Sequence, residues 1–397
     1  MRRRRAVLVI LVILLVLFVV AVAVRRSRRD GSEAPTLSPG ATAETPQATA
    51  APTPEGPVAS ISTIIKDGGR MDWSHALDLI AFDRKGDDGS YDVWTMRPDG
   101  SDQVCVTCET PGLPQGHSGQ PAWSPTGEWI VFQTEKPEHP GGSVKARPGL
   151  GVDNDVWVVT RDGQQAFQLT DTPLESAMLH PHFSPDGSQV LWAERLQRPS
   201  GGQPIGGEWA MKLADFVADG GGRLANVQTL QPNGPVFYET HGFTNDGSRI
   251  LYTSTPEGGT PVTGLDIYTL DLSSGELVNL TASPDEWDEH AHYSPSENKI
   301  VWMSSLDCGC NPHNLGDLKT DLWLMDADGS NKVRLTHFSD PDFPERQGRT
   351  VIAGDTAWSP DGKRVITRLI VDRSLLQLLN LLPEIEPMIM VEFSEPQ

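Results

Sequence analysis

The chain is poor in basic residues once its first 30 positions are set aside. Those positions hold eight of its 32 Lys and Arg residues and one of its 53 Asp and Glu residues, which leaves 24 bases and 52 acids for the rest. So acidic a surface excludes a nucleic-acid-binding protein, since phosphate contacts require a basic face. Aromatic residues are also scarce, at 7%, whereas 38 Gly and 32 Pro favour a turn-rich globular protein over a disordered chain.

The chain has one long apolar run, Ala6–Val24, which contains neither a charge nor a proline. A helix of this length crosses most of a bilayer core, so we predict a transmembrane anchor within residues 1–30. The segment AVA at 21–23 resembles a signal-peptidase site, but the length of the run and the four Arg that follow it favour an uncleaved anchor. Arg clusters on both sides nearly balance the positive-inside rule. We expect a single-pass protein of the cell membrane whose folded domain lies outside the cytoplasm.

Residues 31–57 contain six Pro, six Ala and five Thr, with almost no large apolar residue. Such a segment cannot bury a core, so we predict a disordered, extended linker. The folded domain is therefore expected to cover residues 58–397.

A phrase recurs six times in this domain: an aromatic residue, Ser or Thr, usually Pro, a turn and an apolar strand. Its aromatic residues, at intervals of 50, 60, 60, 50 and 65 positions, are Trp73, Trp123, Phe183, Phe243, Tyr293 and Trp358. A period of this size fits four strands and their turns. A second phrase, alternating in polarity and ending in a Gly turn, supplies a third strand from Asp92, Asp155, Asp266 and Asp321. The third unit contains only a less regular version of this second phrase.

The sequence thus predicts an all-β fold, a six-bladed propeller of four-stranded antiparallel blades, with seven blades as the alternative. The last unit supplies only three strands, while the strand expected at Ser60–Lys66 belongs to no repeat. We expect this strand to complete the last blade, because closure of the ring removes two sheet edges. Trp94, Trp157 and Trp323 in the third strands are expected to pack between blades rather than to bind sugars.

These phrases resemble the repeat of TolB-like propellers, most closely over residues 321–336 and in AWSPDGKRVI at 357–366. The resemblance covers nearly all of residues 58–397 and implies the propeller fold. TolB carries a small α/β domain ahead of its propeller, whereas this chain has an apolar run and a linker there, so no TolB role is carried over. The absence of a G-x-S-x-G motif and of a hydrolase-sized domain excludes a peptidase of the prolyl-oligopeptidase kind.

Strand order predicts that the short turns of both phrases lie on one face of the propeller. The long inserts, at 135–153, 195–207 and 305–319, then lie on the opposite face. Six of the ten histidines come just before an innermost strand: His117, His180, His182, His241, His290 and His292. We expect these side chains, with the nearby Glu239, Asp288 and Glu289, at the rim of a central funnel. Alternation along a strand places His180 and His182 on one side, and likewise His290 and His292.

We predict a metal site in the funnel, formed by His180, His182, His241, His290, His292, Glu239 and Glu289. Imidazoles with carboxylates suit Mn or Zn, and an acidic rim suits Ca. In kind, the cluster resembles the histidine-based metal site of oligogalacturonate lyases, but no motif matches residue by residue, so no catalytic residue is assigned. The alternative is that these histidines hydrogen-bond the repeated turns. Their differing offsets before the aromatic residue argue against it.

The four cysteines form two close pairs. Cys105 and Cys108 fall three residues apart on one expected strand, where their side chains would point to opposite faces, so a regular strand could not join them. Cys308 and Cys310, near His313, are open to three interpretations: a disulfide, a free pair or a partial metal site. The candidate binding face comprises Cys308, Cys310, His313, His117 and Asp288.

The sequence favours a binding scaffold over an enzyme. We expect a membrane-tethered, extracytoplasmic and monomeric propeller that binds a protein, a peptide or a carbohydrate on the face with the long inserts. The alternative is a metal-dependent propeller enzyme, a lyase or hydrolase acting on a carbohydrate.

Overall fold

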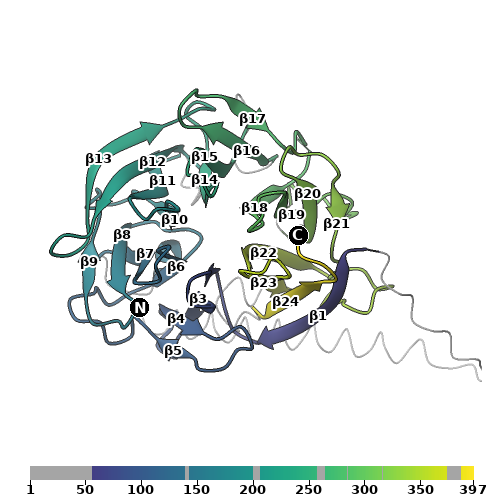
Figure 1. Cartoon of the computed structure of the whole chain (residues 1–397), viewed down its shortest axis with the longest axis horizontal. Helices are drawn as coiled ribbons and strands as arrows, with labels where there is room; N and C mark the ends of the chain where they lie inside the picture. The colour runs from purple at the N-terminus through teal and green to yellow at the C-terminus, as the bar shows by residue number, and fades with distance from the viewer. Residues whose placement is uncertain are drawn as a thin grey trace, which may run out of the picture. The chain divides into compact units, whose positions relative to one another are not determined.

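The computed structural model describes residues 56–138, 143–199, 206–256, 264–283, 285–314, 316–372 and 386–397. In these residues, 24 strands form six sheets of four antiparallel strands each, arranged as blades around one axis (Figure 1). The prediction of a six-bladed propeller is confirmed. The predicted anchor at 6–24 lies outside the described residues, as does all but the end of the linker at 31–57. Among the described residues, no helix is long and apolar enough to cross a membrane.

In each blade the strand that carries the repeated aromatic residue is innermost (Figure 1). Blade one comprises β2 (Met71–Ser74), β3 (Leu79–Lys85), β4 (Tyr91–Met96) and β5 (Val104–Cys105). Blade two comprises β6 (Ser118–Trp123), β7 (Trp129–Glu135), β8 (Asn154–Thr160) and β9 (Ala166–Gln168), with a short 3-10 helix at Val144–Ala146 between β7 and β8. Blade three, blurred in the sequence, comprises β10 (Met178–Phe183), β11 (Gln189–Gln197), β12 (Glu208–Val217) and β13 (Arg223–Leu230).

The remaining blades follow the same order, and the last one closes the ring. Blade four comprises β14 (Tyr238–Phe243), β15 (Arg249–Ser254), β16 (Asp266–Asp271) and β17 (Leu277–Asn279). Blade five comprises β18 (Asp288–Tyr293), β19 (Lys299–Ser304), β20 (Asp321–Asp326) and β21 (Val333–Arg334). Blade six comprises β22 (Val351–Trp358), β23 (Arg364–Val371), β24 (Met388–Phe393) and the N-terminal β1 (Val58–Ile65). The pairing of β1 with β24 confirms the predicted closure.

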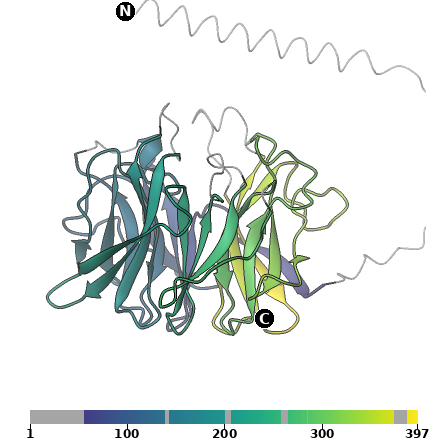
Figure 2. The ribbon, with the colours of Figure 1, turned by 90° about the horizontal axis from the view of Figure 1, so that it is seen from above.

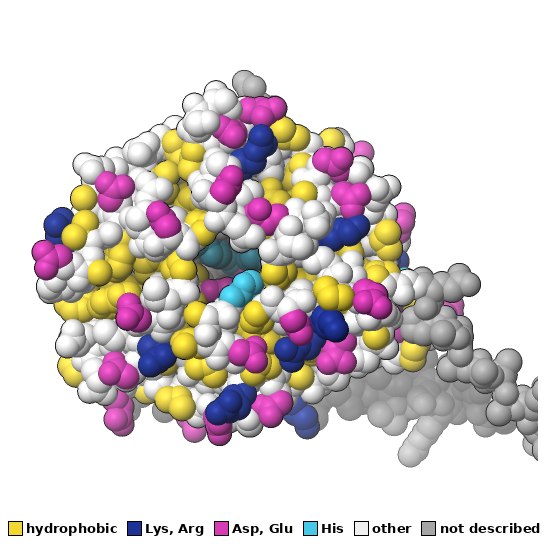
Figure 3. Space-filling view, viewed as in Figure 1, with side chains coloured by type: hydrophobic (Ala, Val, Ile, Leu, Met, Phe, Trp, Pro, Cys, Tyr) yellow, Lys and Arg dark blue, Asp and Glu magenta, His cyan; other side chains and the backbone are white. Residues whose placement is uncertain are grey.

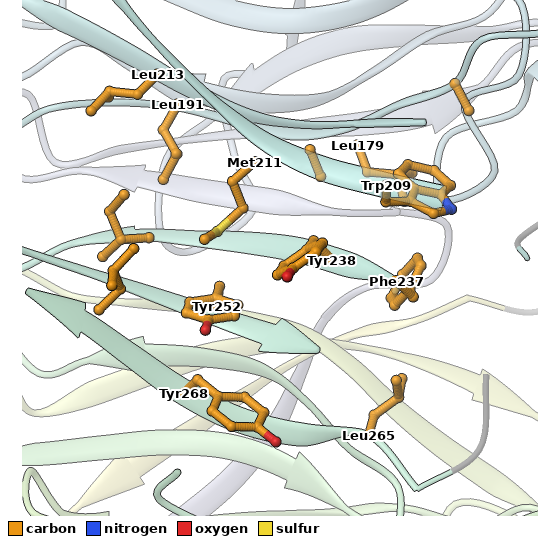
Figure 4. Close-up of a cluster of buried hydrophobic side chains, with 14 of the residues drawn as sticks. Leu179, Leu191, Trp209, Met211, Leu213, Phe237, Tyr238, Tyr252, Leu265 and Tyr268 are labelled. Atoms are coloured by element: carbon orange, nitrogen blue, oxygen red, sulfur yellow. The ribbon is translucent and has the colours of Figure 1, made fainter. Parts of the chain in front are cut away.

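Large apolar side chains fill the spaces between blades. Between blades three and four, Leu191 and Met211 lie across from Tyr238 and Tyr252, and all four are fully buried (Figure 4). Among the third-strand tryptophans, Trp157 and Trp323 are also buried in such clusters. Trp94 is half-buried and packs against a third cluster. The expected packing role of these residues is confirmed.

The repeated turn is held by a hydroxyl group that makes two hydrogen bonds. In blade three the Ser184 hydroxyl donates to Asp186 Oδ1 (2.6 Å) and accepts the N–H of Gln189 (2.9 Å). The turns that begin at Thr244 and Ser359 repeat both bonds. In blade six, the C-terminal Gln397 donates its N–H to Gly362 in such a turn, so the chain end and the short turns share one face (Figure 2). The connection that leaves β7 at its other end, described at 136–138 and 143–153, lies on the opposite face, as predicted.

A second repeated contact joins the third and fourth strands. In blade four the Thr281 hydroxyl accepts the N–H of Ile267 (3.0 Å) and donates to the buried Asp266 carboxylate (2.9 Å). Equivalent Thr–Asp pairs occur in blades one, two and five: Thr107–Asp92, Thr170–Asp155 and Thr336–Asp321. Each contact provides a hydrogen-bond partner for both the Asp carboxylate and a backbone N–H group, which explains why this Thr and this Asp recur together in the repeat.

We predict that Thr281→Val lowers the free energy of unfolding by about 1–3 kcal/mol, because the change leaves the Ile267 N–H without its partner and removes one donor from buried Asp266. Chemical denaturation monitored by circular dichroism measures the effect. The exposed Thr63 on β1 provides the control, since Thr63→Val removes a hydroxyl of the same kind from the surface. Equal stability of the two variants would contradict a stabilising role for the Thr–Asp pair.

The turn carboxylate also predicts a pH dependence. Hydrogen bonds from the Ser184 hydroxyl and from Ser188 lower the pKa of Asp186 from 3.8 to about 2. A carboxylate whose pKa is lower in the folded than in the unfolded protein stabilises the fold at pH values above its unfolded-state pKa. This stabilisation is lost as the pH falls through its folded-state pKa. We therefore expect Asp186→Asn to lower the melting temperature above about pH 4, with the deficit shrinking towards about pH 2. Asp87→Asn, at an exposed position, should show no such trend.

Candidate metal centre on the propeller axis

Three innermost strands contain the same backbone irregularity, three positions before the aromatic residue. Gln120, His180 and His290 have φ angles of 52°, 46° and 54°, in the left-handed region that non-glycine residues rarely adopt. The strand register shifts at each of these positions, as in a β-bulge. The simple alternation expected for His180 and His182, and for His290 and His292, is thus interrupted between the two members of each pair.

Four side chains from three consecutive blades meet on the axis. They are His180 of β10, Glu239 and His241 of β14, and His290 of β18, and one donor atom of each lies within 4.8 Å of the others. Glu239 Oε1 lies 2.8 Å from His180 Nε2 and 3.1 Å from His290 Nδ1. Figure 3 shows histidine and acidic side chains in a hollow at the centre of the ring.

Each of the three imidazoles has its second nitrogen near an acceptor outside the group. His241 Nε2 is 2.7 Å from the Thr253 hydroxyl. His180 Nδ1 is 3.7 Å from Asp355 Oδ1, and His290 Nε2 is 3.7 Å from Glu289 Oε2. The inner atoms are less well satisfied: His241 Nδ1 and His290 Nδ1 are buried and make no hydrogen bond of good geometry to any described residue. All three imidazoles thus have an acceptor behind them, and two of them also have an unsatisfied inward nitrogen. Histidine metal ligands show this arrangement of outer acceptors.

The charges of the group depend on one another. Burial opposes ionisation of Glu239, but His180 and then His290 outweigh it and hold the pKa of this carboxyl well below its usual range. Burial also opposes a charge on His290, yet Asp355, Glu239 and Glu289 raise its pKa to about 9. Burial, and next the charge of Glu239, raise the pKa of Glu289 to about 8. At neutral pH without an ion, a proton on His290 therefore compensates the ionised carboxylates.

The chain matches no family model and no curated protein. Several solved structures share its architecture. A TolB protein from Agrobacterium tumefaciens is 20% identical over 69% of this chain and 76% of that chain, with a TM-score of 0.46. TolB from Acinetobacter baumannii is 15% identical over 84% of this chain and 65% of that chain, with a TM-score of 0.44. An oligogalacturonate lyase from Vibrio parahaemolyticus is 13% identical over 84% and 93%, with a TM-score of 0.47.

The structural neighbours are TolB proteins and other β-propellers. At these identities the likeness concerns the fold, which the six sheets described above establish independently. The candidate site must be judged from its own residues.

The seven predicted metal ligands fall into two groups. His180, Glu239, His241 and His290 form the four-residue centre. His182 and His292 form a second layer, with ring centroids 6.1 Å apart, and His292 Nδ1 lies 3.0 Å from the Thr356 hydroxyl. Burial lowers the pKa of His182 to about 3 and that of His292 to about 4, so both rings are neutral at pH 7. Glu289 stands behind His290 and accepts a hydrogen bond from Trp287 Nε1 (2.8 Å).

The residues predicted for the binding face do not gather at this centre. His117 is buried, accepts the N–H of Tyr91 at Nδ1 and donates its own N–H to Glu135. Asp288 accepts the indole N–H of Trp302 (2.9 Å). His313 is exposed in the insert after β19. The contacts of His117 and Asp288 are those of structural residues between neighbouring strands.

All four cysteines are paired. Cys308 and Cys310 form a disulfide, so their sulfur atoms do not provide a partial metal site. Cys105 and Cys108 also form a disulfide, contrary to the expectation from a regular strand. The reason is that β5 ends at Cys105, and the turn that follows brings Cys108 back to a Cα–Cα distance of 5.8 Å.

Sequence reasoning missed the side of the axis that carries no histidine. The third position before the aromatic residue is polar in all six blades: Arg70, Gln120, His180, Thr240, His290 and Asp355. Asp355 is 4% exposed and lies 3.5 Å from His290 Nδ1. A comparison of this single offset across the six repeats would have identified Asp355 and Gln120 together with the histidines.

Proposed function

We propose that this protein binds a divalent transition-metal ion on the propeller axis through His180, Glu239, His241 and His290. The convergence of these four donor atoms within 4.8 Å carries the proposal. The Thr253 hydroxyl supports it, because its contact with Nε2 orients the His241 ring and leaves Nδ1 facing the centre. Carboxylate oxygens also lie 3.7 Å behind the rings of His180 and His290. The local excess of carboxylates supports it as well, since an ion can replace the proton on His290.

The donor set favours some metals over others. Three imidazoles and one carboxylate suit Mn, Fe or Zn, whereas Ca prefers a shell of oxygen atoms. Of the ions expected from the sequence, Mn and Zn therefore fit and Ca does not. Catalytic metal sites keep at least one coordination position for a ligand. The hollow in Figure 3 would give such a ligand access to the axis.

We propose that the bound ion serves ligand binding, so that the protein acts as a metal-dependent binding propeller. The propeller would hold the ion rigidly, because its four ligands lie on three innermost strands, with Glu239 and His241 on the same strand. A bound ion would supply Lewis acidity and a fixed positive charge, while the protein residues would hold and orient it. Glu289 and Asp355 would keep the imidazoles in position.

The metal proposal predicts about one Mn, Fe or Zn per chain in the full-length protein, purified in detergent without chelator and measured by elemental analysis. The double variant His241→Ala, His290→Ala should retain less than about a tenth of the metal, because it removes two of four ligands. His75→Ala and His313→Ala change exposed histidines outside the centre and should keep the full content. A folded wild-type protein that contains no metal and takes up none from added Mn or Zn would contradict the proposal.

We further propose that residues 6–24 anchor the protein in the cell membrane with the propeller outside the cytoplasm. The two disulfides support this location, since such bonds persist in oxidising compartments and are rare in the cytosol. The excess of acidic residues and the Pro-rich linker are compatible with a domain tethered to the membrane.

The location is tested by fractionation and thiol labelling. The full-length protein should remain with membranes at high salt, and deletion of residues 1–30 should release it. In intact cells a membrane-impermeant maleimide should label the cysteines only after reduction, because all four are oxidised. Recovery of the full-length protein in the soluble fraction would contradict the anchor. Absence of labelling in intact cells after treatment with a membrane-impermeant reductant would contradict the compartment.

A further inference from the structure

Opposite the proposed metal ligands, charged and polar residues of the other three blades form a second wall close to the axis. Asp355 of β22 and Arg368 of β23 come from blade six, and Gln120 of β6 comes from blade two. Arg70 precedes β2 in blade one and lies 3.9 Å from Asp83 Oδ1. Asp355 connects the two halves: its Oδ1 lies near His180 and His290, and its Oδ2 is 4.0 Å from Arg368 Nε.

Three polar atoms of this wall are buried without a hydrogen-bond partner among the described residues: Gln120 Nε2, Arg368 Nε and Asp355 Oδ2. The residues are only 3%, 6% and 4% exposed. Such atoms cost free energy unless a ligand or water satisfies them. Gln120 is held in place by its other polar atom, because Oε1 accepts the backbone N–H of His180 (3.0 Å).

The three atoms are two donors and one acceptor, which is the complement of a hydroxyl group. A hydroxyl oxygen can accept from Arg368 Nε while its hydrogen is donated to Asp355 Oδ2. Two atoms 4.0 Å apart can both lie about 2.8 Å from one such oxygen. A peptide carbonyl can only accept and would leave Asp355 Oδ2 unsatisfied. The wall therefore favours a ligand group that can both donate and accept a hydrogen bond.

The charge balance selects an uncharged ligand. A divalent ion and the guanidinium groups of Arg70 and Arg368 would supply four positive charges. They would be opposed by the four neighbouring carboxylates Asp83, Glu239, Asp355 and Glu386. Glu289, whose Oε2 lies 3.7 Å from His290 Nε2, is a further carboxylate on the ligand side. With the ion in place the carboxylates would equal or exceed the positive charges on the axis, so an anionic ligand would leave an uncompensated buried charge.

We infer that this wall and the metal together bind vicinal hydroxyl groups of an uncharged sugar, one at the ion and its neighbour between Arg368 Nε and Asp355 Oδ2. Gln120 would donate to the same sugar, since its side chain and that of Asp355 both lie against His180. This inference rests on the proposed metal site and names the ligand class that the site takes. Sugars carry hydroxyls on adjacent carbons at the spacing needed to reach two neighbouring subsites. Figure 3 shows a hollow at the centre of the ring, along which the sugar would reach the axis.

The test uses the full-length protein in detergent, stripped of metal and reloaded with Co²⁺, whose visible absorption reports its ligands. Methyl α-D-mannopyranoside, with a cis-diol, and methyl β-D-glucopyranoside, with trans-diols, are titrated in turn. We expect at least one of them to change the absorption saturably. Acetate, a small anion, should change it less at the same concentration.

Gln120→Glu separates ligand binding from structure. The variant keeps the oxygen that accepts the His180 N–H but replaces the unpartnered amide donor by an acceptor. We expect cobalt affinity to be unchanged or higher, because a carboxylate is added near the ion, while the affinity for the sugar falls at least tenfold. Gln189→Glu, on β11, is the matched control and should change neither. Arg368→Lys keeps the charge but moves the donor, and should also weaken the sugar if Gln120→Glu fails to fold.

The possible failures are distinguishable. Absence of cobalt absorption removes the metal site, and this inference with it. Normal cobalt absorption without a response to either glycoside, or with a stronger response to acetate, overturns this inference alone. Sugar binding that Gln120→Glu and Arg368→Lys both leave intact overturns the assignment to this wall.

Discussion

Closure of the ring is the constraint on which the rest of the structure depends. β1 pairs antiparallel with β24, so the sheet of blade six is built from both ends of the propeller. A closed ring forces six innermost strands to share one axis, and residues far apart in sequence meet there. His180 and His290 belong to the two blades on either side of Glu239, and a ring nitrogen of each lies 2.8 or 3.1 Å from Glu239 Oε1. An open sheet would offer no such convergence.

The axis is also where the chain departs from regular structure. Gln120, His180 and His290 adopt left-handed backbone conformations at one repeat offset, each costing of the order of 1–3 kcal/mol. Buried carboxylates and unsatisfied imidazole nitrogens add to this cost. The large apolar clusters between blades offset it. Strain and polar burial confined to one place, in an otherwise well-packed fold, are typical of a site selected for binding rather than for stability.

The blades were predictable because their signals are local. The Ser184–Asp186 turn and the Thr281–Asp266 pair are each formed within one blade, so the same residue types recur at the same positions of the repeat. The composition of the axis was only partly predictable. Histidine signals a metal ligand by its identity, whereas Asp355 and Gln120 gain meaning only from their position on the axis. The bulges that separate His180 from His182, and the turn that joins Cys105 to Cys108, interrupt regular strands and could not be read from alternation.

Asp355 gives the axis its most consequential property, because its two oxygens face different halves of the hollow. Oδ1 lies near the imidazoles of His180 and His290, and Oδ2 lies near Arg368. Any ligand that draws this carboxylate towards the wall changes the field at the imidazoles, and an ion between the imidazoles changes how strongly Asp355 accepts a hydrogen bond. Linkage requires the two effects to be equal in free energy. One buried carboxylate thus couples the histidine half of the axis to the arginine half.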